Sequence, residues 1–342
     1  MTEAFRYRLP EGAAIVSETD GIVKISVTMP ADDSGHIGRQ CPDCERMFRI
    51  NAEDYKVLPD DQLLTCPYCC VVKSHSEYMT EQQRQRALAA AGEYAQQLIK
   101  SSLNDTFKNL AQKSRPRGRG GVSITYTSSA VTEPDALPGI DEESPIRERT
   151  CIQCSTRYAI FGEHIACPVC GRLPPEVISR DALEALEVAL TMLEDLPTDL
   201  LDQLRESGAL DRTAAGSLGS VVSILEMFLK QIFLDRVVGG DVIIAGKGNV
   251  FQRLDDASQL YRDHLKINFP AALGLSDWDR LCELYGIRHL NTHTNGDVDA
   301  KHAARFPNSV VGKRFSATSA DSREAIKLAQ KVVSAVPQMN AH

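Results

Sequence analysis

Two hydrophobic patterns divide this chain into a β-rich first half and a helical second half. The run IVKISVTM follows the turn sequence Thr19-Asp20-Gly21, which predicts strands within about residues 5–40. From Pro174 onward, apolar residues recur at helical spacing in four or five segments joined by short connections. The patterns predict an α+β multidomain protein that ends in an all-α antiparallel helical bundle, residues 174–342.

A long helix is predicted between the two halves, over residues 80–113. The sequence TEQQ matches a capping box, with Thr80 as the N-cap and Gln83 at the third helical position. At 1.5 Å per residue this helix is about 50 Å long. Its apolar stripe needs a partner, either another domain or a second copy of the chain; the stripe comprises Leu88, Ala91, Ala95, Leu98, Ser102 and Leu110.

Three features of the helical half refine this prediction. Ser179 is a plausible N-cap for the first bundle helix. The apolar stretch VVSILEMFLKQIF is interrupted by Glu226 and Lys230 and is too short to span a bilayer. The segment VVGGDVIIAG is either a β-excursion or a glycine-rich turn, and it lacks the spacing of a phosphate loop.

Eight of the ten cysteines form four C-x-x-C pairs. Paired thiolates at this spacing are typical of tetrahedral zinc sites, in which two turns each supply two ligands. With all four positions taken by cysteine, such ions are structural, so we expect two structural zinc ions and none for catalysis. The predicted ligands are Cys41, Cys44, Cys66 and Cys69 in one zinc ribbon, and Cys151, Cys154, Cys167 and Cys170 in the other.

These ribbons set the predicted domain boundaries. Residues 1–79 hold strands and the first ribbon, and residues 149–173 hold the second. Residues 114–148 are predicted as a linker, because SRPRGRGG ends the long helix and EPDALPGIDEESP is acidic and contains proline. Cys70 stands where the second ribbon has Gly171, so it is either a spectator or a fifth thiol competing for the ion.

Charge limits the classes of function. A net charge of -8 over 342 residues argues against nonspecific coating of nucleic acid. The arginines near the ribbons are accompanied by acidic residues, so nucleic-acid binding by the ribbons stays open, and stabilising a small core is a sufficient role. The segment MTEAFRYRLPEG lacks an apolar stretch of signal-peptide length, and we expect a cytoplasmic protein without a membrane partner.

The sequence RHLNTHTNGD, beginning at Arg288, concentrates polar chemistry at one predicted helix end, with Asn295-Gly296 as its C-cap. Three interpretations compete. Cationic side chains favour the negative end of a helix dipole without any function. His289 and His293, one turn apart, suggest a metal site, although no H-E-x-x-H glutamate accompanies them. The third interpretation is acid–base chemistry on phosphodiesters, with a histidine moving protons and an arginine neutralising charge.

Arg288-x4-His293 resembles the R-x4-6-H motif of the HEPN superfamily of helical-bundle ribonucleases. Asn295-Gly296 is similar to the helix ending of many such domains, and Glu226-x3-Lys230 resembles their accessory E-x3-K pattern. The resemblance covers about residues 178–338.

The resemblance implies a metal-independent endoribonuclease that serves as a toxin or an anti-phage defence effector. His293 would act as general base or acid, Arg288 would hold the scissile phosphate, and His289, Asn291 and Glu226 would orient these groups or contact RNA. The implied partners are RNA, a second copy of the chain that completes the site, and a regulatory protein or activating ligand. The alternative is a non-catalytic dimerising module whose ribbons bind nucleic acid or a partner protein.

Overall fold

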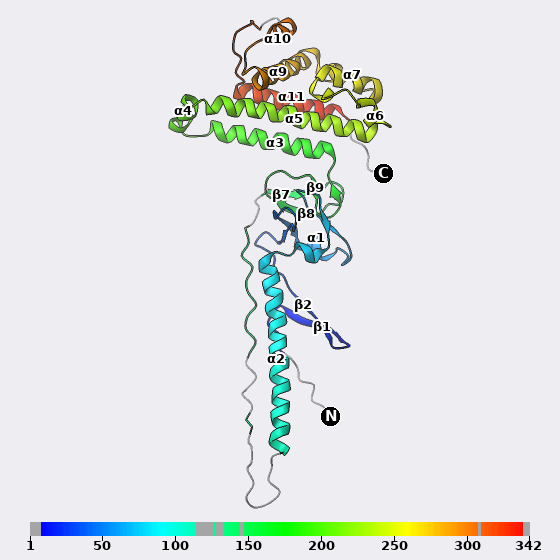
Figure 1. The fold of residues 1–342 in the computed structure, drawn as a ribbon, viewed down its shortest axis with the longest axis vertical. Helices are drawn as coiled ribbons and strands as arrows, with labels where there is room; N and C mark the ends of the chain where they lie inside the picture. Colours follow the sequence, from blue (N-terminus) through cyan, green and yellow to red (C-terminus); the bar gives the residue numbers. More distant parts are fainter. Residues whose placement is uncertain (1–7, 114–125, 128–132, 144–146, 307–308, 338–342) are drawn as a thin grey trace, which may run out of the picture. The chain divides into compact units, whose positions relative to one another are not determined.

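The computed structural model describes residues 8–113, 126–127, 133–143, 147–306 and 309–337 (Figure 1). The chain divides into two compact units: unit 1 comprises Met1–Phe161 and Ala166–Gly171, and unit 2 comprises Gly162–Ile165 and Arg172–His342. Small sheets lie in the N-terminal half and helices dominate the C-terminal half. The predicted mixed α+β class is therefore confirmed.

Unit 1 begins with the predicted hairpin. Strand β1 (Ala13–Thr19) pairs antiparallel with β2 (Ile22–Val27). The turn residues Asp20 and Gly21 both have positive φ, 53° and 76°. Positive φ at both central residues matches the right-handed twist of the strands, which is why Asp-Gly is favoured in two-residue hairpin turns.

One four-stranded sheet joins the two cysteine-containing regions, which the sequence had placed in separate units. Its order is β3 (His36–Gln40), β4 (Met47–Asn51), β8 (Arg157–Ile160) and β7 (Arg147–Thr150). In the central β4–β8 pair, Arg49 lies opposite Ala159. When CPDCERMFRI is aligned with CIQCSTRYAI, these two residues are equivalent. An approximate two-fold relation between the two regions therefore passes through this pair.

The same relation holds at two shorter hairpins. β5 (Leu64–Thr65) pairs with β6 (Val72–Lys73), and β9 (Ala166–Cys167) pairs with β10 (Gly171–Arg172). The Thr65 amide donates to the Pro168 carbonyl at 2.8 Å, and the Ala166 amide donates to the Pro67 carbonyl at 3.1 Å. The two halves thus exchange equivalent backbone hydrogen bonds. Helix α1 (Ala52–Lys56) and the short helix η1 (His75–Tyr78) complete this part of unit 1.

The long helix α2 (Glu81–Lys113) starts where the capping box predicts. The Gln83 amide N–H donates to Thr80 Oγ1 at 3.2 Å, and the Thr80 N–H donates to Gln83 Oε1 at 3.4 Å. Gln83 is buried, and its side chain also donates to the Gly38 carbonyl and accepts from Arg39. One glutamine therefore caps the helix and fastens it to β3.

Much of the apolar surface of α2 is exposed. Phe107 stacks on Tyr126, with ring centroids 5.4 Å apart. The partner predicted for this helix stays a prediction. The exposed apolar residues are Leu88, Leu98, Ile99, Leu103, Phe107 and Leu110.

Part of the predicted linker 114–148 is bound to unit 1. The side chain of Gln82 exchanges two hydrogen bonds with the backbone of Asp141, and Arg86 donates to the Pro138 carbonyl at 2.5 Å. Buried Arg49 donates to the Glu142 carbonyl at 2.7 Å. Residues 133–143 are therefore held to unit 1, because arginine and glutamine side chains satisfy the backbone of this segment, which its composition does not show. The three arginines of the stretch SRPRGRGG, Arg115, Arg117 and Arg119, lie outside the described residues.

Unit 2 is built on three long helices that pack pairwise (Figure 1). They are α3 (Pro175–Glu194), α5 (Ala209–Arg236) and α11 (Ser319–Ala335). Helix α9 (Leu275–His293) packs against both α5 and α11. Shorter elements complete the unit: α4 (Thr198–Glu206), α6 (Gly240–Ile244), η2 (Val250–Gln252), α7 (Leu254–Leu265), α8 (Phe269–Leu273) and α10 (Ala300–Arg305).

Helix α3 begins earlier than predicted. Its N-cap is Pro174 and its first residue is Pro175, so Ser179 lies inside the helix and is buried. Proline suits the first helical turn because its fixed φ is already helical and its missing N–H has no partner there. The prediction of Ser179 as N-cap is therefore wrong.

Helix α5 is long and apolar enough to cross a membrane by length and composition. The helix extends beyond the stretch VVSILEMFLKQIF by twelve residues at its N-terminal end and by three at its C-terminal end. Half of its most apolar window is buried within the protein, and its apolar side chains belong to the main core cluster. The segment after α5 is the glycine-rich turn: Gly239 has φ 69° and starts the short helix α6.

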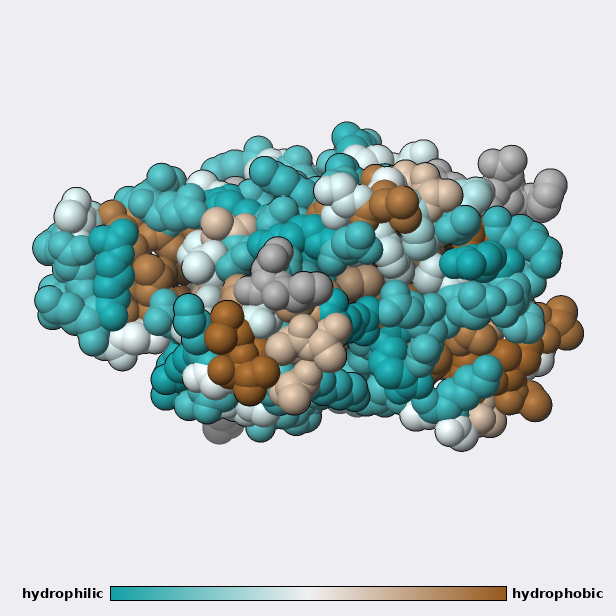
Figure 2. All heavy atoms as spheres, turned by 90° about the horizontal axis from the view of Figure 1, so that it is seen from above, coloured by the Kyte–Doolittle hydropathy of each residue, from teal (hydrophilic) through white to brown (hydrophobic). Residues whose placement is uncertain are grey.

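The surface seen in Figure 2 is mainly hydrophilic, and its apolar side chains lie in separate patches. Large continuous apolar patches are what mark protein docking sites. In the described part of this face, the apolar surface is divided into separate patches, so the face shows no such docking site.

A buried ion pair holds the start of α3 to the end of α5. Arg236 Nη2 lies 2.7 Å from Glu176 Oε1, with side-chain exposures of 13% and 8%. Glu176→Ala is expected to lower the free energy of unfolding of unit 2 by about 3 kcal/mol, because it leaves a buried arginine unpaired. Urea unfolding followed by the fluorescence of Trp278, the single tryptophan, measures this change. As control, Asp202→Ala breaks the exposed pair with Arg205 and should cost less than about 0.5 kcal/mol; equal losses would contradict the prediction.

Candidate functional site

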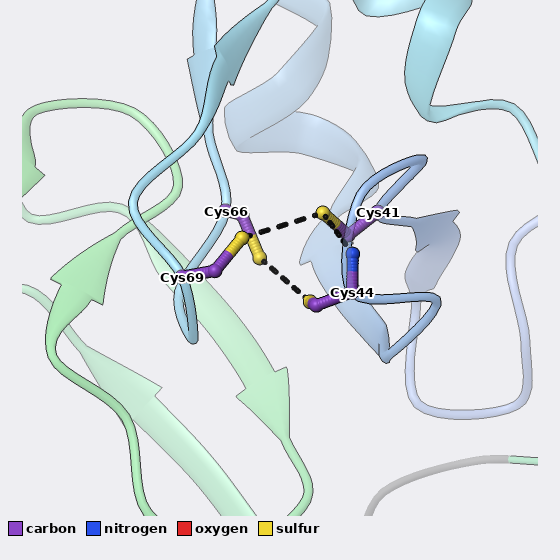
Figure 3. A group of neighbouring side chains, drawn as sticks. All are labelled: Cys41, Cys44, Cys66 and Cys69. Carbon is purple, nitrogen blue, oxygen red and sulfur yellow. Dashed lines mark hydrogen bonds between the residues drawn. The ribbon is translucent and has the colours of Figure 1, made fainter.

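Four cysteine side chains from two turns converge in unit 1 (Figure 3). Cys41 and Cys44 lie between β3 and β4, and Cys66 and Cys69 lie between β5 and β6. Across the group, Cys41 Sγ is 3.6 Å from Cys69 Sγ, and Cys44 Sγ is 3.7 Å from Cys66 Sγ. These four residues are named here the first cysteine cluster.

A second cysteine cluster has the same form. Cys151 Sγ is 3.4 Å from Cys170 Sγ, and Cys154 Sγ is 3.6 Å from Cys167 Sγ. In each cluster the ligand atoms all lie within 4.8 Å of one another. Sulfur atoms bound to one tetrahedral ion at about 2.3 Å are about 3.8 Å apart, so both clusters fit structural metal sites.

Backbone geometry explains why these turns present their sulfurs together. In all four turns the residue after the second cysteine has a φ between 60° and 90°: Glu45, Cys70, Ser155 and Gly171. Within the turns, backbone N–H groups face the sulfur of the first cysteine, as from Tyr68 to Cys66 at 3.5 Å and from Val169 to Cys167 at 3.4 Å. Cys70 occupies the position of Gly171 and lies outside the first cluster.

The arginines near the clusters have partners within unit 1. Arg46 stacks on the Tyr68 ring at 3.5 Å and donates to the Phe161 carbonyl. Arg49 pairs with Asp32 at 3.1 Å, and Arg157 pairs with Asp54 at 2.8 Å. The Arg157 guanidinium lowers the pKa of the Asp54 carboxyl. These contacts explain the positions of the three arginines, and no nucleic-acid ligand is needed to explain them.

The two clusters predict two bound metal ions per chain, measurable by elemental analysis of the purified protein. Cys44→Ser should remove one ion, because only three thiolates then remain in the first cluster. Cys70→Gly should keep both ions and raise the free energy of unfolding of unit 1 by about 1 kcal/mol, since glycine adopts φ 61° without strain. Loss of an ion from Cys70→Gly would assign Cys70 a ligand role and contradict this arrangement.

The other candidate site lies at the end of α9 in unit 2. The helix stops after His293 because Asn295 and Gly296 have positive φ, 54° and 90°. The N–H groups of Thr294 and Gly296 both donate to the Leu290 carbonyl. Gly296 is required here, because a Cβ would lie 2.4 Å from the Phe315 carbonyl oxygen. The predicted helix end is thus confirmed.

The two histidines lie side by side on this end, and both are exposed. The ring centroids of His289 and His293 are 4.5 Å apart. Burial, and then the neighbouring His293, lower the pKa of His289 from its ordinary value. A neutral imidazole at neutral pH accepts a proton, which is the property that a general base needs.

Arg288 lies on another side of the helix. Residues five apart in an α-helix point about 140° apart, so Arg288 and His293 do not share a face. Arg288 is half-buried, and its Nε has no hydrogen-bond partner among the described residues. Burial raises the pKa of the Tyr285 hydroxyl, and the nearby charge of Arg288 lowers it.

The remaining predicted residues are divided between the sides of α9. Glu226 on α5 accepts a hydrogen bond from Gln252 at 2.7 Å, and its charge raises the pKa of Tyr285. Asn291 lines a cavity of about 350 Å³ together with Arg212 and Arg314. The structure therefore groups Glu226 with the buried side of α9, and Asn291 with a separate polar cavity.

Comparison with protein-family models, curated proteins and solved structures finds no match to this chain. The resemblance to HEPN ribonucleases accordingly rests on the motif residues alone.

Sequence analysis missed the residues that face His289. Tyr285, His302 and Phe306 line one cavity with it, although they come from two helices and a connecting segment. Gly286, in the middle of α9, is the available indication: a Cβ there would lie 2.8 Å from Phe306 Cε2 and 2.9 Å from His302 Cε1. A glycine inside a helix marks a close approach of another element.

His302 predicts a pH dependence of stability. Burial lowers its pKa, as do the charges of His289 and Arg305, against the opposing effect of Asp299 and Glu283. The unfolded state therefore binds a proton at a higher pH than the folded state. The stability is complete above the ordinary pKa of about 6.5 and decreases as the pH falls below it.

Urea unfolding followed by Trp278 fluorescence at about pH 7.5 and pH 5.5 measures this effect. The free energy of unfolding should fall at the lower pH, and His302→Gln should reduce that fall. An unchanged difference in His302→Gln would show that other groups cause the pH dependence.

Proposed function

We propose that unit 2 is a metal-independent endoribonuclease whose active site is built at the C-terminal end of α9. The observation that carries this proposal is the exposed His289–His293 pair, 4.5 Å between ring centroids, one residue from Arg288. The pair lies in an all-helical unit at a helix end that also carries the Arg-x4-His spacing. Neutral histidine and fixed cation are the two groups that phosphodiester cleavage needs.

In the proposed mechanism, His293 removes the proton from a ribose 2′-hydroxyl, and the resulting oxygen attacks the adjacent phosphorus. The leaving 5′-oxygen receives a proton from a histidine, and Arg288 neutralises the charge that develops on the phosphate. The products carry a 2′,3′-cyclic phosphate and a 5′-hydroxyl. His289, Asn291 and Glu226 orient these groups or contact the RNA.

A second copy of the chain completes the proposed site. Arg288 and His293 point about 140° apart on one helix, so a single phosphate does not meet both from one α9. A two-fold axis near the helix ends would place the arginine of one copy opposite the histidine of the other. The exposed apolar residues of α2 offer a further surface for such a dimer.

The two cysteine clusters are proposed to hold zinc, which all-thiolate tetrahedral sites favour. Their role is structural, since all four ligands come from protein. The resemblance extends the whole proposal to a toxin or anti-phage defence effector controlled by a regulatory protein or ligand.

One observation favours the non-catalytic alternative, in which unit 2 is a dimerising module. Arg288 is half-buried and lies beside Tyr285 and Glu226, as expected of a structural arginine. The assay below separates the two functions.

Purified protein is incubated with transfer RNA and total RNA in EDTA at a concentration that leaves the thiolate-bound metals in place. Cleavage should occur, and Arg288→Ala and His293→Ala should each reduce the rate at least about 100-fold, the usual loss on removing a general acid–base or charge-stabilising group. Phosphatase and kinase treatment of the products identifies the cyclic phosphate and the 5′-hydroxyl.

Arg262→Ala is the matched control, because Arg262 is an exposed arginine on α7 of the same unit. It should cleave at the wild-type rate. The catalytic proposal fails if cleavage is absent under every condition, or if Arg288→Ala and His293→Ala cleave as fast as Arg262→Ala.

A further inference from the structure

A cavity of about 280 Å³ opens beside His289 in unit 2. Helix α9 supplies Tyr285, Gly286 and His289, and His302 and Phe306 lie across from them. Its volume is close to the smallest pockets that hold small molecules and exceeds that of a single planar heterocycle.

Two polar groups in the wall of this cavity are buried without partners. Tyr285 and His302 are 8% and 7% exposed, and neither Tyr285 Oη nor His302 Nε2 has a hydrogen-bond partner among the described residues. Buried polar atoms in native proteins are almost always paired, because an unpaired one is destabilising. Both atoms are covered by protein in this structure, so a ligand with a hydrogen-bonding edge supplies the missing partner only when the cavity wall shifts to uncover them.

The same wall is aromatic. The rings of His302 and Phe306 lie 4.8 Å apart and pack directly against Gly286, which has no side chain to separate them from α9. Burial lowers the pKa of His302, so its ring is neutral at neutral pH and suited to a neutral ligand. The wall therefore combines flat apolar surface with hydrogen-bonding groups.

The cavity is lined by three acidic and three basic side chains, so its lining carries no net charge: Asp255, Asp256, Asp299, Arg253, Lys301 and Arg305. Asp255 is engaged by Arg305 and by the Cys282 thiol, and Asp299 caps α10 through the His302 N–H. Lys301 is exposed, and its charge lowers the pKa of His289. On the side of the cavity where His289 lies, Lys301 and Asp299 act on its pKa in opposite directions, and Lys301 is the group that an anionic part of a ligand would meet.

We propose that this cavity binds one unstacked nucleobase of an RNA strand, whose neighbouring phosphate then lies toward Lys301 and His289. The base packs on Phe306 and hydrogen-bonds to Tyr285 and His302. Recognition of RNA typically uses such splayed bases, stacked on aromatic rings and bonded at their edges. The assignment of RNA as the ligand rests on the proposed ribonuclease function, and the cavity selects which base is placed beside the histidines.

The test titrates the full metal-loaded chain with each of the four nucleoside 5′-monophosphates by isothermal titration calorimetry. At least one should bind with 1:1 stoichiometry. Tyr285→Phe should weaken that binding about tenfold, the loss of one hydrogen bond, while its melting temperature is unchanged or raised, because the deleted hydroxyl has no partner in the fold. Weaker binding without a lower melting temperature would distinguish a contact of Tyr285 with the ligand from a structural role of this residue.

Gly286→Ala displaces His302 and Phe306, because its Cβ would lie 2.9 Å and 2.8 Å from their rings, and it should abolish binding. Its control is Gly216→Ala, a helical glycine in α5 with open space around its Cβ position, which should bind as the wild type does. Absence of binding by all four nucleotides at millimolar concentration overturns the proposal. Equal affinities of the wild type and Tyr285→Phe overturn it as well.

The two proposals fail separately. If RNA is cleaved but Tyr285→Phe and Gly286→Ala leave the base preference at the cleavage site unchanged, the nucleobase cavity is wrong and the ribonuclease stands. If a nucleotide binds as described but RNA is never cleaved, the cavity stands and the catalytic proposal fails.

Discussion

Four cysteine sulfurs brought within 4.8 Å of one another fit one structural metal ion, and unit 1 contains two such clusters. Each C-x-x-C turn closes a hairpin too short to bury a core of its own, and one ion bound at a cluster would join two such hairpins. The β4–β8 pairing unites both cysteine-containing regions in a single sheet. Without the ions, like charges or desolvated thiols would face one another at the points where the hairpins meet.

Buried arginines extend this frame to segments distant in sequence. Arg49 lies at the centre of the sheet, where it meets the carboxylate of Asp32 and the carbonyl of Glu142. Arg39 donates to Gln83, and its guanidinium lies over the Tyr55 ring. A buried guanidinium is destabilising unless most of its donors meet acceptors, and this requirement favours one chain path around each arginine, although Arg39 Nε has no partner among the described residues. That requirement explains why residues 133–143 follow unit 1 despite a composition typical of a linker.

Features that depend on contacts between residues close in sequence could be predicted, and features that depend on distant residues could not. Thr80 and Gln83, the Asp20-Gly21 turn and the end of α9 are decided by contacts a few residues apart, and each was predictable. The four-cysteine clusters were predictable because ligand spacing carries the chemistry. The union of the two sheets, the partners of Arg49 and the cavity at His302 depend on residues tens to hundreds of positions apart, which a single sequence does not relate. Ser179 was misplaced because two prolines begin α3 earlier.

The geometry of α9 limits what the Arg-x4-His spacing can mean. On a straight helix this spacing directs the two side chains about 140° apart, so the motif by itself cannot form a one-chain catalytic pair. The half-buried Arg288 is oriented by the packing of α5 and α9, whereas His293 and His289 are exposed. An interface between two copies would remove water from around Arg288 and strengthen its attraction for a phosphate, because electrostatic interactions grow as the local dielectric falls. Association of two copies would then make Arg288 effective in binding phosphate, and the free chain would offer only the exposed histidines His289 and His293. A ribonuclease arranged in this way is inactive until two helix ends meet, which links its chemistry to whatever controls its assembly.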